Sequence, residues 1–142
     1  MKDYQAVIEE DFFTIREMVK VYNLRAAFNI VLDLTRICTL FDDDDGIIIM
    51  EVLEGVFSQV GSVFDNYDVP ENLKTEFASN VVEELDKLIE NYKSKNQIEI
   101  YKNLRHIRTI STKLQIVQIR TGIQSNKKEH FTIPNFSNLL SR

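Results

Sequence analysis

Glycine and proline are scarce in this chain of 142 residues, which contains four glycines and two prolines. An average protein carries about three times that share. β-Sandwiches and barrels need turn residues every ~8–12 positions, so the scarcity excludes them, and it also excludes collagen-like and Pro/Gly-rich disordered chains. Because 44% of the residues are hydrophobic, the chain can still build a packed core.

Cysteine and histidine are also few. Cys38 is the single cysteine, so no intrachain disulfide can form. It falls on an apolar helix face, where a free cysteine is usually an inert small hydrophobic residue. His106 and His130 lack the ligand spacing of zinc and di-iron sites, and no phosphate-binding glycine loop is present. We therefore expect no cofactor, no metal site and no enzyme activity.

Long uncharged apolar runs are missing too. The most apolar stretch, residues 46–64, carries Glu51 and Glu54, whereas a membrane span needs about 20 largely uncharged residues. Glu9 and Glu10 interrupt any signal-peptide pattern at the start. These features predict a cytoplasmic protein with no membrane partner.

Apolar residues recur at the i, i+3, i+4 spacing of amphipathic helices along most of the chain. One helix over the first forty or so residues would be about 55 Å long, too long for this domain, so we place a break near residues 21–23. Further helices are expected over residues 45–66, from just after Asp68 with Pro70 in the first turn, and over 97–121. The sequence predicts an all-α, single-domain helical bundle of about five helices over residues 1–124, with the 45–66 and 97–121 helices near its centre. A short C-terminal tail, residues 125–142, follows.

Two capping boxes mark predicted helix starts, Asp68 with Glu71 and Asn96 with Glu99. In such a box the first side chain accepts from a free N–H of the first turn, and the Glu reaches back to the cap.

Two smaller patterns predict where side chains face. Gly55, Ser58 and Ser62 form a ridge of small residues, which favours close helix packing inside the bundle, with a self-association face as the alternative. Glu83 and Glu84 are adjacent on a helix, so they point in different directions and are expected to be solvated.

Four consecutive acids, Asp42, Asp43, Asp44 and Asp45, precede Gly46. A calcium-binding EF-hand loop is excluded, because Phe41 and Val52 occupy its first and last ligand positions. The run is expected to cap the next helix, where carboxylates satisfy free N–H groups and the helix dipole. A loose divalent-cation site and an acidic docking patch remain open as alternatives.

Charge is distributed very unevenly. Residues 1–90 hold 7 Lys and Arg against 20 Asp and Glu, a net charge of −13, whereas residues 91–142 hold 10 against 2, a net of +8. A helical wheel gathers most of the later cations into one basic stripe on the 97–121 helix, which is otherwise expected to be largely buried. The stripe comprises Lys95, Lys102, Arg105 at its flank, His106, Lys113 and Arg120, and Lys127 and Lys128 extend it into the tail.

Three interpretations of the basic stripe stay open: a solvated surface offset by acids elsewhere in the fold, a nucleic-acid-binding surface, and a surface that binds an acidic protein or a second copy. The wheel places no aromatic residue among the cations, which argues against base stacking. The tail adds Phe136, Leu139 and Leu140 at amphipathic spacing, which predicts docking in a groove of a partner or packing on its own domain. The favoured hypothesis is a non-enzymatic protein–protein interaction or assembly module that acts through charge-complementary helical surfaces, with a protein partner or as a homo-oligomer. Nucleic-acid binding is the alternative.

Overall fold

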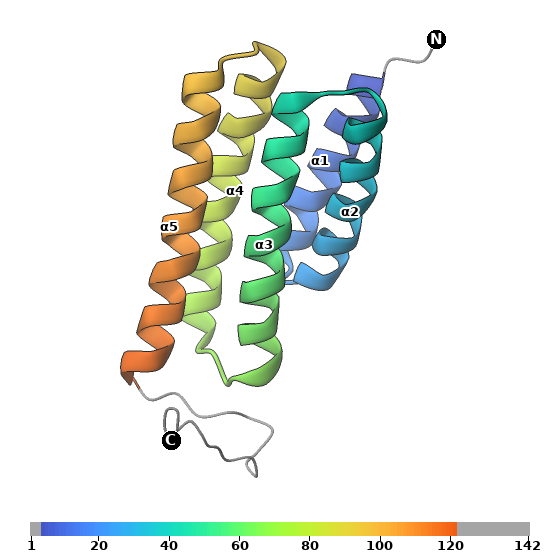
Figure 1. The fold of residues 1–142 in the computed structure, drawn as a ribbon. Coiled ribbons are helices and arrows are strands. Elements are labelled where there is room, and N and C mark those ends of the chain that lie inside the picture. The colour runs from blue at the N-terminus through green and yellow to red at the C-terminus, as the bar shows by residue number, and fades with distance from the viewer. Residues whose placement is uncertain (1–3, 122–142) are drawn as a thin grey trace.

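The computed structural model describes residues 4–121, with side chains described as far as residue 117, and these residues form five α-helices joined by short connections (Figure 1). The all-α bundle predicted from the sequence is confirmed, and so is the break at residues 21–23. The helices are α1 (Tyr4–Lys20), α2 (Leu24–Leu40), α3 (Asp44–Asn66), α4 (Glu71–Lys93) and α5 (Gln97–Thr121).

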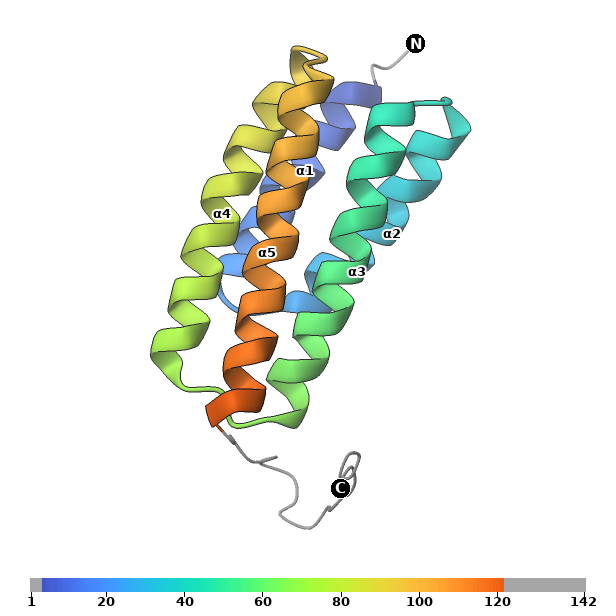
Figure 2. The same ribbon diagram turned by 60° about the vertical axis from the view of Figure 1, so that its left-hand side comes forward.

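The helices surround a shared core in the order α1, α2, α3, α5, α4, and α4 closes the ring by packing against α1 (Figures 1 and 2). Each helix therefore packs mainly on two neighbours. The expectation that α3 and α5 lie at the centre is wrong, because no described helix is surrounded by the others. The buried side chains of all five helices converge on one apolar core, with Ile15, Leu34, Leu53, Leu88 and Ile107 fully or almost fully enclosed.

α3 is the one described helix that is long and apolar enough to cross a membrane, judged by length and composition alone. α3 meets this criterion of length and composition even though it contains Glu51 and Glu54. The core helix of a soluble bundle meets the same criterion, and α3 here buries Leu53, Phe57 and Val60 against its neighbours.

Three of the four connections use the same turn, and none of them contains glycine. Each has one residue in the left-handed region, with φ of 64° at Tyr22, 53° at Asp42 and 58° at Lys95. The N–H of the following residue bonds the carbonyl five residues earlier, at 2.8 to 2.9 Å. This is the Schellman helix ending, which usually places glycine at the left-handed position.

The residue after each left-handed position also starts the next helix. Asn23, Asp43 and Asn96 accept the N–H three residues further on, at 3.1, 3.1 and 3.3 Å. Each of these residues thus ends one helix through its backbone N–H and begins the next helix through its side-chain oxygen. The Asn96 cap predicted from the sequence is confirmed.

The connection between α3 and α4 differs, and the capping box predicted at Asp68 is wrong. Pro70 is the N-cap residue, and its carbonyl accepts the first bonds of α4 from Leu73 and Lys74. A cap at Asp68 would need Val69 in the helical region, which the following proline disfavours. Val69 is instead buried, only 5% exposed.

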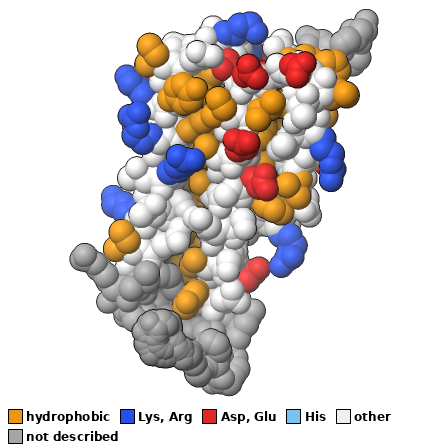
Figure 3. All heavy atoms as spheres, viewed as in Figure 1, with side chains coloured by type: hydrophobic (Ala, Val, Ile, Leu, Met, Phe, Trp, Pro, Cys, Tyr) orange, Lys and Arg blue, Asp and Glu red, His pale blue; other side chains and the backbone are white. Residues whose placement is uncertain are grey.

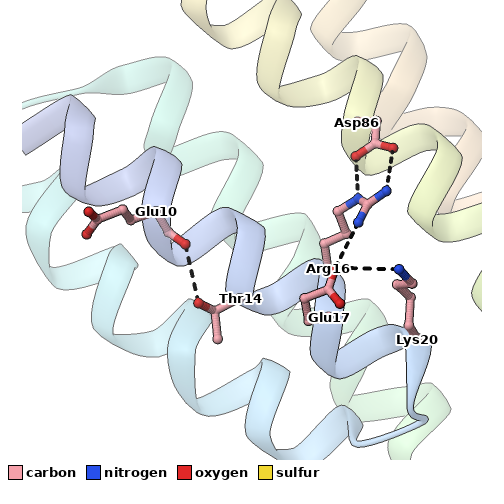
Figure 4. Close-up of polar contacts among 6 residues, drawn as sticks. All are labelled: Glu10, Thr14, Arg16, Glu17, Lys20 and Asp86. Atoms are coloured by element: carbon pink, nitrogen blue, oxygen red, sulfur yellow. Dashed lines mark hydrogen bonds and ion pairs between the residues drawn. The ribbon is translucent and has the colours of Figure 1, made fainter.

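An ion pair joins α1 and α4 where their packing closes the ring. The Arg16 guanidinium donates to both carboxylate oxygens of Asp86, at 2.7 and 3.3 Å, and to Glu17 at 2.8 Å (Figure 4). Lys20 lies 3.6 Å from the same Glu17 carboxylate, as Figure 4 also shows. Because these side chains are 27% to 51% exposed, the ion pairs orient the two helices more than they stabilise them.

The turn between α2 and α3 requires glycine at position 46, because the surrounding atoms leave no room for a side chain there. A Cβ atom there would lie 2.5 Å from the Cys38 sulfur and 3.0 Å from an Asp43 carboxylate oxygen. Contacts this short require the buried Cys38 side chain, the Asp43 cap or the packing of α2 on α3 to shift. We expect Gly46→Ala to lower the free energy of unfolding by about 2 kcal/mol, measured by urea denaturation.

The Cys38→Ala background is the matched test of this cause, because it removes the sulfur that the new Cβ would meet. Gly46→Ala is expected to cost at least ~1 kcal/mol less in that background, in a double-mutant cycle. Equal costs in the two backgrounds would contradict a clash with Cys38.

Candidate interaction surface

The exposed side of α5 carries the basic stripe. Lys95, Lys102, Arg105, His106 and Lys113 are all exposed, as a solvent-facing stripe requires. The side chain of Arg120, together with Lys127 and Lys128, lies outside the described residues.

The cations of α5 are mostly not neutralised within the described part of the fold. Lys102 pairs with Glu99 one turn earlier, at 3.2 Å. Arg105, Arg108 and Lys113 form no ion pair with any described side chain. The helix therefore presents concentrated positive charge to solvent.

Large apolar side chains share this surface with the cations. Ile98 is 71% exposed, Tyr101 48% and Ile116 45%. The expectation that the rest of α5 is largely buried is wrong, because Tyr101 and Ile116 face solvent. Because α5 packs only against α3 and α4, it has one buried side, and these residues lie opposite it. We call Ile98, Tyr101, Lys102, Arg105 and Ile116 the α5 face.

Acidic side chains lie beside the α5 face, over α3 (Figure 3). Asp44 and Glu51 are exposed there, and Glu54 is half-buried. The polar contacts between α3 and α5 nevertheless come from amides: Gln97 donates to Asp45 at 3.0 Å and Gln115 to Gln59 at 3.3 Å. Basic and acidic surfaces are thus neighbours that no ion pair joins among the described residues.

A groove of about 290 Å³ separates these two surfaces, with Glu51 and Gly55 of α3 on one side and Arg108 of α5 on the other. Gly55, Ser58 and Ser62 are exposed, and a Cβ at Gly55 would meet nothing within 4 Å. The prediction that this ridge packs inside the bundle is therefore wrong. Its use as a self-association face stays a prediction.

Glu84 is not a solvated surface acid, contrary to expectation, because it is only 9% exposed and lies between α4 and α5. Its carboxylate accepts from Asn103 at 3.0 Å, and Asn103 accepts from Asn91 at 2.7 Å. His106 Nδ1 lies 3.4 Å from the same carboxylate. His106 thus forms an ion pair with Glu84 when it is protonated, and belongs to this α4–α5 network rather than to the free cations.

The four acids of the Asp42–Asp45 run have separate roles. Asp43 is the α3 cap, as predicted, and its other carboxylate oxygen accepts hydroxyl hydrogen bonds from Tyr4 of α1, at 3.2 Å, and from Tyr92 of α4. Asp45 accepts from Gln97. Asp42 and Asp44 are exposed, and only they suit the predicted acidic docking patch. The described residues contain no group of three or more side chains placed to hold a metal ion.

The groups around Asp43 are held in their neutral forms. Burial, reinforced by the Asp43 carboxylate, raises the pKa of the Cys38 thiol to about 12. Burial and the hydrogen bond to Asp43 raise the pKa of Tyr92, and burial followed by Asp43 raises that of Tyr4. A neutral, fully buried thiol is a poor nucleophile, which fits a structural role for Cys38.

The remaining predicted residues, Phe136, Leu139 and Leu140 of the tail, lie outside the described residues. The chain matches no protein-family model, no curated protein and no solved structure.

Removing the Asp43 carboxylate is expected to destabilise the whole bundle. Asp43→Ala removes one cap and leaves two tyrosine hydroxyls without their acceptor, so the free energy of unfolding should fall by about 3 kcal/mol in urea denaturation. Asp42→Asn is the matched control, since asparagine tolerates the left-handed backbone and the side chain is exposed; it should change the value by less than ~0.5 kcal/mol. Similar losses for the two variants would contradict this role of Asp43.

Alkaline pH is expected to weaken the fold. Cys38 and Tyr92 have ordinary pKa values of 9.0 and 10.0, which apply in the unfolded chain, and both pKa values are higher in the folded protein. The unfolded chain therefore binds fewer protons above about pH 9, and stability present below that pH is lost as pH rises toward the folded pKa values. Urea midpoints measured at increasing pH should fall, and Tyr92→Phe should flatten the decline. Tyr67→Phe, at an exposed position, is the control; an equal effect there would contradict the assignment.

Proposed function

We propose that this protein is a non-enzymatic assembly module whose α5 face binds an acidic protein surface, which a second copy of the chain can supply. The observation that carries the proposal is the coexistence, on one exposed helix side, of Lys102 and Arg105 with Ile98, Tyr101 and Ile116. Protein interfaces are enriched in arginine and in aromatic residues, and they bury an apolar centre inside a polar rim.

The apolar part of the α5 face favours a protein over a nucleic acid. A phosphate backbone attracts cations but offers no apolar surface for isoleucine to contact. Ile98 and Ile116 are nevertheless 71% and 45% exposed on the α5 face. An acidic surface with apolar residues at its centre matches both kinds of side chain.

The chain carries an acidic surface itself. Residues 1–90 have a net charge of −13, and exposed Asp44 and Glu51 of α3 belong to it. A contact between the α5 face of one copy and the acids of another joins two different patches, so it is a heterologous association. Its strength should depend on salt, because its charges lie at the surface.

Nucleic-acid binding is the second candidate, and one observation favours it. Tyr101 is 48% exposed and lies one turn before Arg105, so an aromatic ring does stand among the cations, contrary to the sequence-based prediction. Exposed rings beside arginine are the usual platform for stacked bases.

Self-association is expected to be salt-dependent and to require the α5 face. Sedimentation velocity at about 0.05 M and about 0.5 M NaCl should show species heavier than the 16.6 kDa monomer at the lower salt only. Lys102→Glu with Arg105→Glu should abolish them, and Ile116→Ser, which changes no charge, should weaken them. Arg25→Glu with Arg36→Glu is the control, since it makes the same charge change on exposed residues of α2.

The outcomes separate the two candidates. A wild-type chain that stays monomeric at low salt contradicts the assembly proposal. Binding of a fluorescent oligo(dT) or of a single-stranded RNA that Tyr101→Ala and Arg105→Glu abolish, and that Ile116→Ser leaves unchanged, would favour the nucleic-acid candidate instead.

A further inference from the structure

A second groove, between the first half of α4 and the second half of α5, is mainly apolar. It has a volume of about 160 Å³. Phe77 and Leu114 form its floor, only 3% and 6% exposed, and Leu73 and Ile110 line its sides half-buried. Val117 also lines it, nearest to the end of α5.

This groove lies at the end of the bundle from which the C-terminal segment departs. α4 and α5 are antiparallel, so the start of α4 lies beside the end of α5 (Figure 2). Val117 is one helical turn before Thr121, the last residue of α5. The groove therefore extends back along the bundle from the point where the segment begins.

The segment that follows, residues 122–142, has an apolar motif suited to such a groove. Phe136, Leu139 and Leu140 have i, i+3, i+4 spacing after Pro134, so one turn of helix would place the three side chains together. Proline is well tolerated in the first turn of a helix, where its missing N–H costs nothing.

Chain length permits the motif to reach the groove. The 15 residues from Thr121 to Phe136 span up to about 50 Å when extended. The groove residues Ile110 and Val117 are separated by only about 10 Å along α5. A tether of this length gives an effective concentration on the order of millimolar, which favours a contact within one chain over a contact between chains.

Charge also favours this placement. The residues between α5 and the motif include Lys127 and Lys128, and they would pass the end of the bundle where α3 leads into α4. The surface at that end is acidic, and its members are all exposed: Asp65, Asp68, Glu71 and Glu76. The groove itself is lined by one acid and one cation, Glu76 and Lys113, so the charge argument concerns the end of the bundle and not the groove.

We infer that the C-terminal segment docks intramolecularly in the α4–α5 groove, with Phe136, Leu139 and Leu140 against Leu73, Phe77 and Leu114. The docked motif covers Leu73 and Ile110, which the five helices leave half-buried, above the buried floor of Phe77 and Leu114. This contact lies on the α4 side of α5 and does not require the proposed assembly function.

Paramagnetic relaxation in the full chain tests the docking. A nitroxide on Ser137→Cys places the probe inside the motif, while buried Cys38, whose thiol pKa is about 12, should remain unlabelled at neutral pH. Amide signals of residues 73–77 and 110–117 are expected to lose most of their intensity, and those of α2 are expected to keep it. Adding Phe136→Ser, Leu139→Ser and Leu140→Ser should restore the lost signals, whereas Asn135→Ser with Asn138→Ser, the matched control, should not.

A mixed sample distinguishes docking within one chain from docking between copies. It combines isotope-labelled chains without the nitroxide and unlabelled chains that carry it. Signal loss that occurs when one chain carries both the isotopes and the nitroxide, and not in the mixed sample, supports the inference. Equal loss in the mixed sample, loss at other surfaces in place of the groove, or no loss at all would each overturn it.

Discussion

The carboxylate of Asp43 is the interaction on which the bundle most depends. It accepts the N–H of Gly46 at the start of α3 and the hydroxyl groups of Tyr4 on α1 and Tyr92 on α4. α1 and α4 are not neighbours in sequence, and they are the pair that closes the ring. One partly buried side chain therefore fixes where α3 begins and how the ends of two other helices lie. The absence of a Cβ at Gly46 lets Cys38 and this carboxylate approach the same turn.

The turns explain how the helices of this protein can end without glycine. Tyr22, Asp42 and Lys95 take the left-handed position that glycine usually occupies, and each precedes an Asn or Asp that caps the next helix. The cap and the Schellman bonds together offset the conformational cost, which is about 1–2 kcal/mol for each such residue. Periodicity and length predicted where the first break falls, but they could not show this turn because no single residue type marks the left-handed position. At Asp68 the capping pattern misled, because the proline two residues later decides the backbone of Val69.

The cations of the α5 face could be predicted from the sequence, whereas its apolar members could not. A helical wheel shows which residues share a side, but it does not show how many neighbours a helix has. Tyr101 and Ile116 would be buried if α5 were central, and they are exposed because only α3 and α4 flank it. Glu84 illustrates the opposite error. Its adjacency to Glu83 suggests a solvated pair, yet the helical turn directs it toward Asn103 on α5.

Among the described residues, most cations of α5 form no ion pair with the acids of residues 1–90, and this is a physical reason to propose an external role for both. If the acids of residues 1–90 served to neutralise α5, ion pairs should join α3 to α5 where the two helices pack. Among the described residues that interface is bridged by Gln97 and Gln115 instead, while Arg105 and Arg108 form no ion pair. Unpaired charges on one molecule repel like charges and attract opposite ones on another, over about 10 Å at 0.1 M salt. Opposite charges on adjacent surfaces of one chain are therefore the physical basis of the association between copies proposed above, in which displaced, unlike patches would meet.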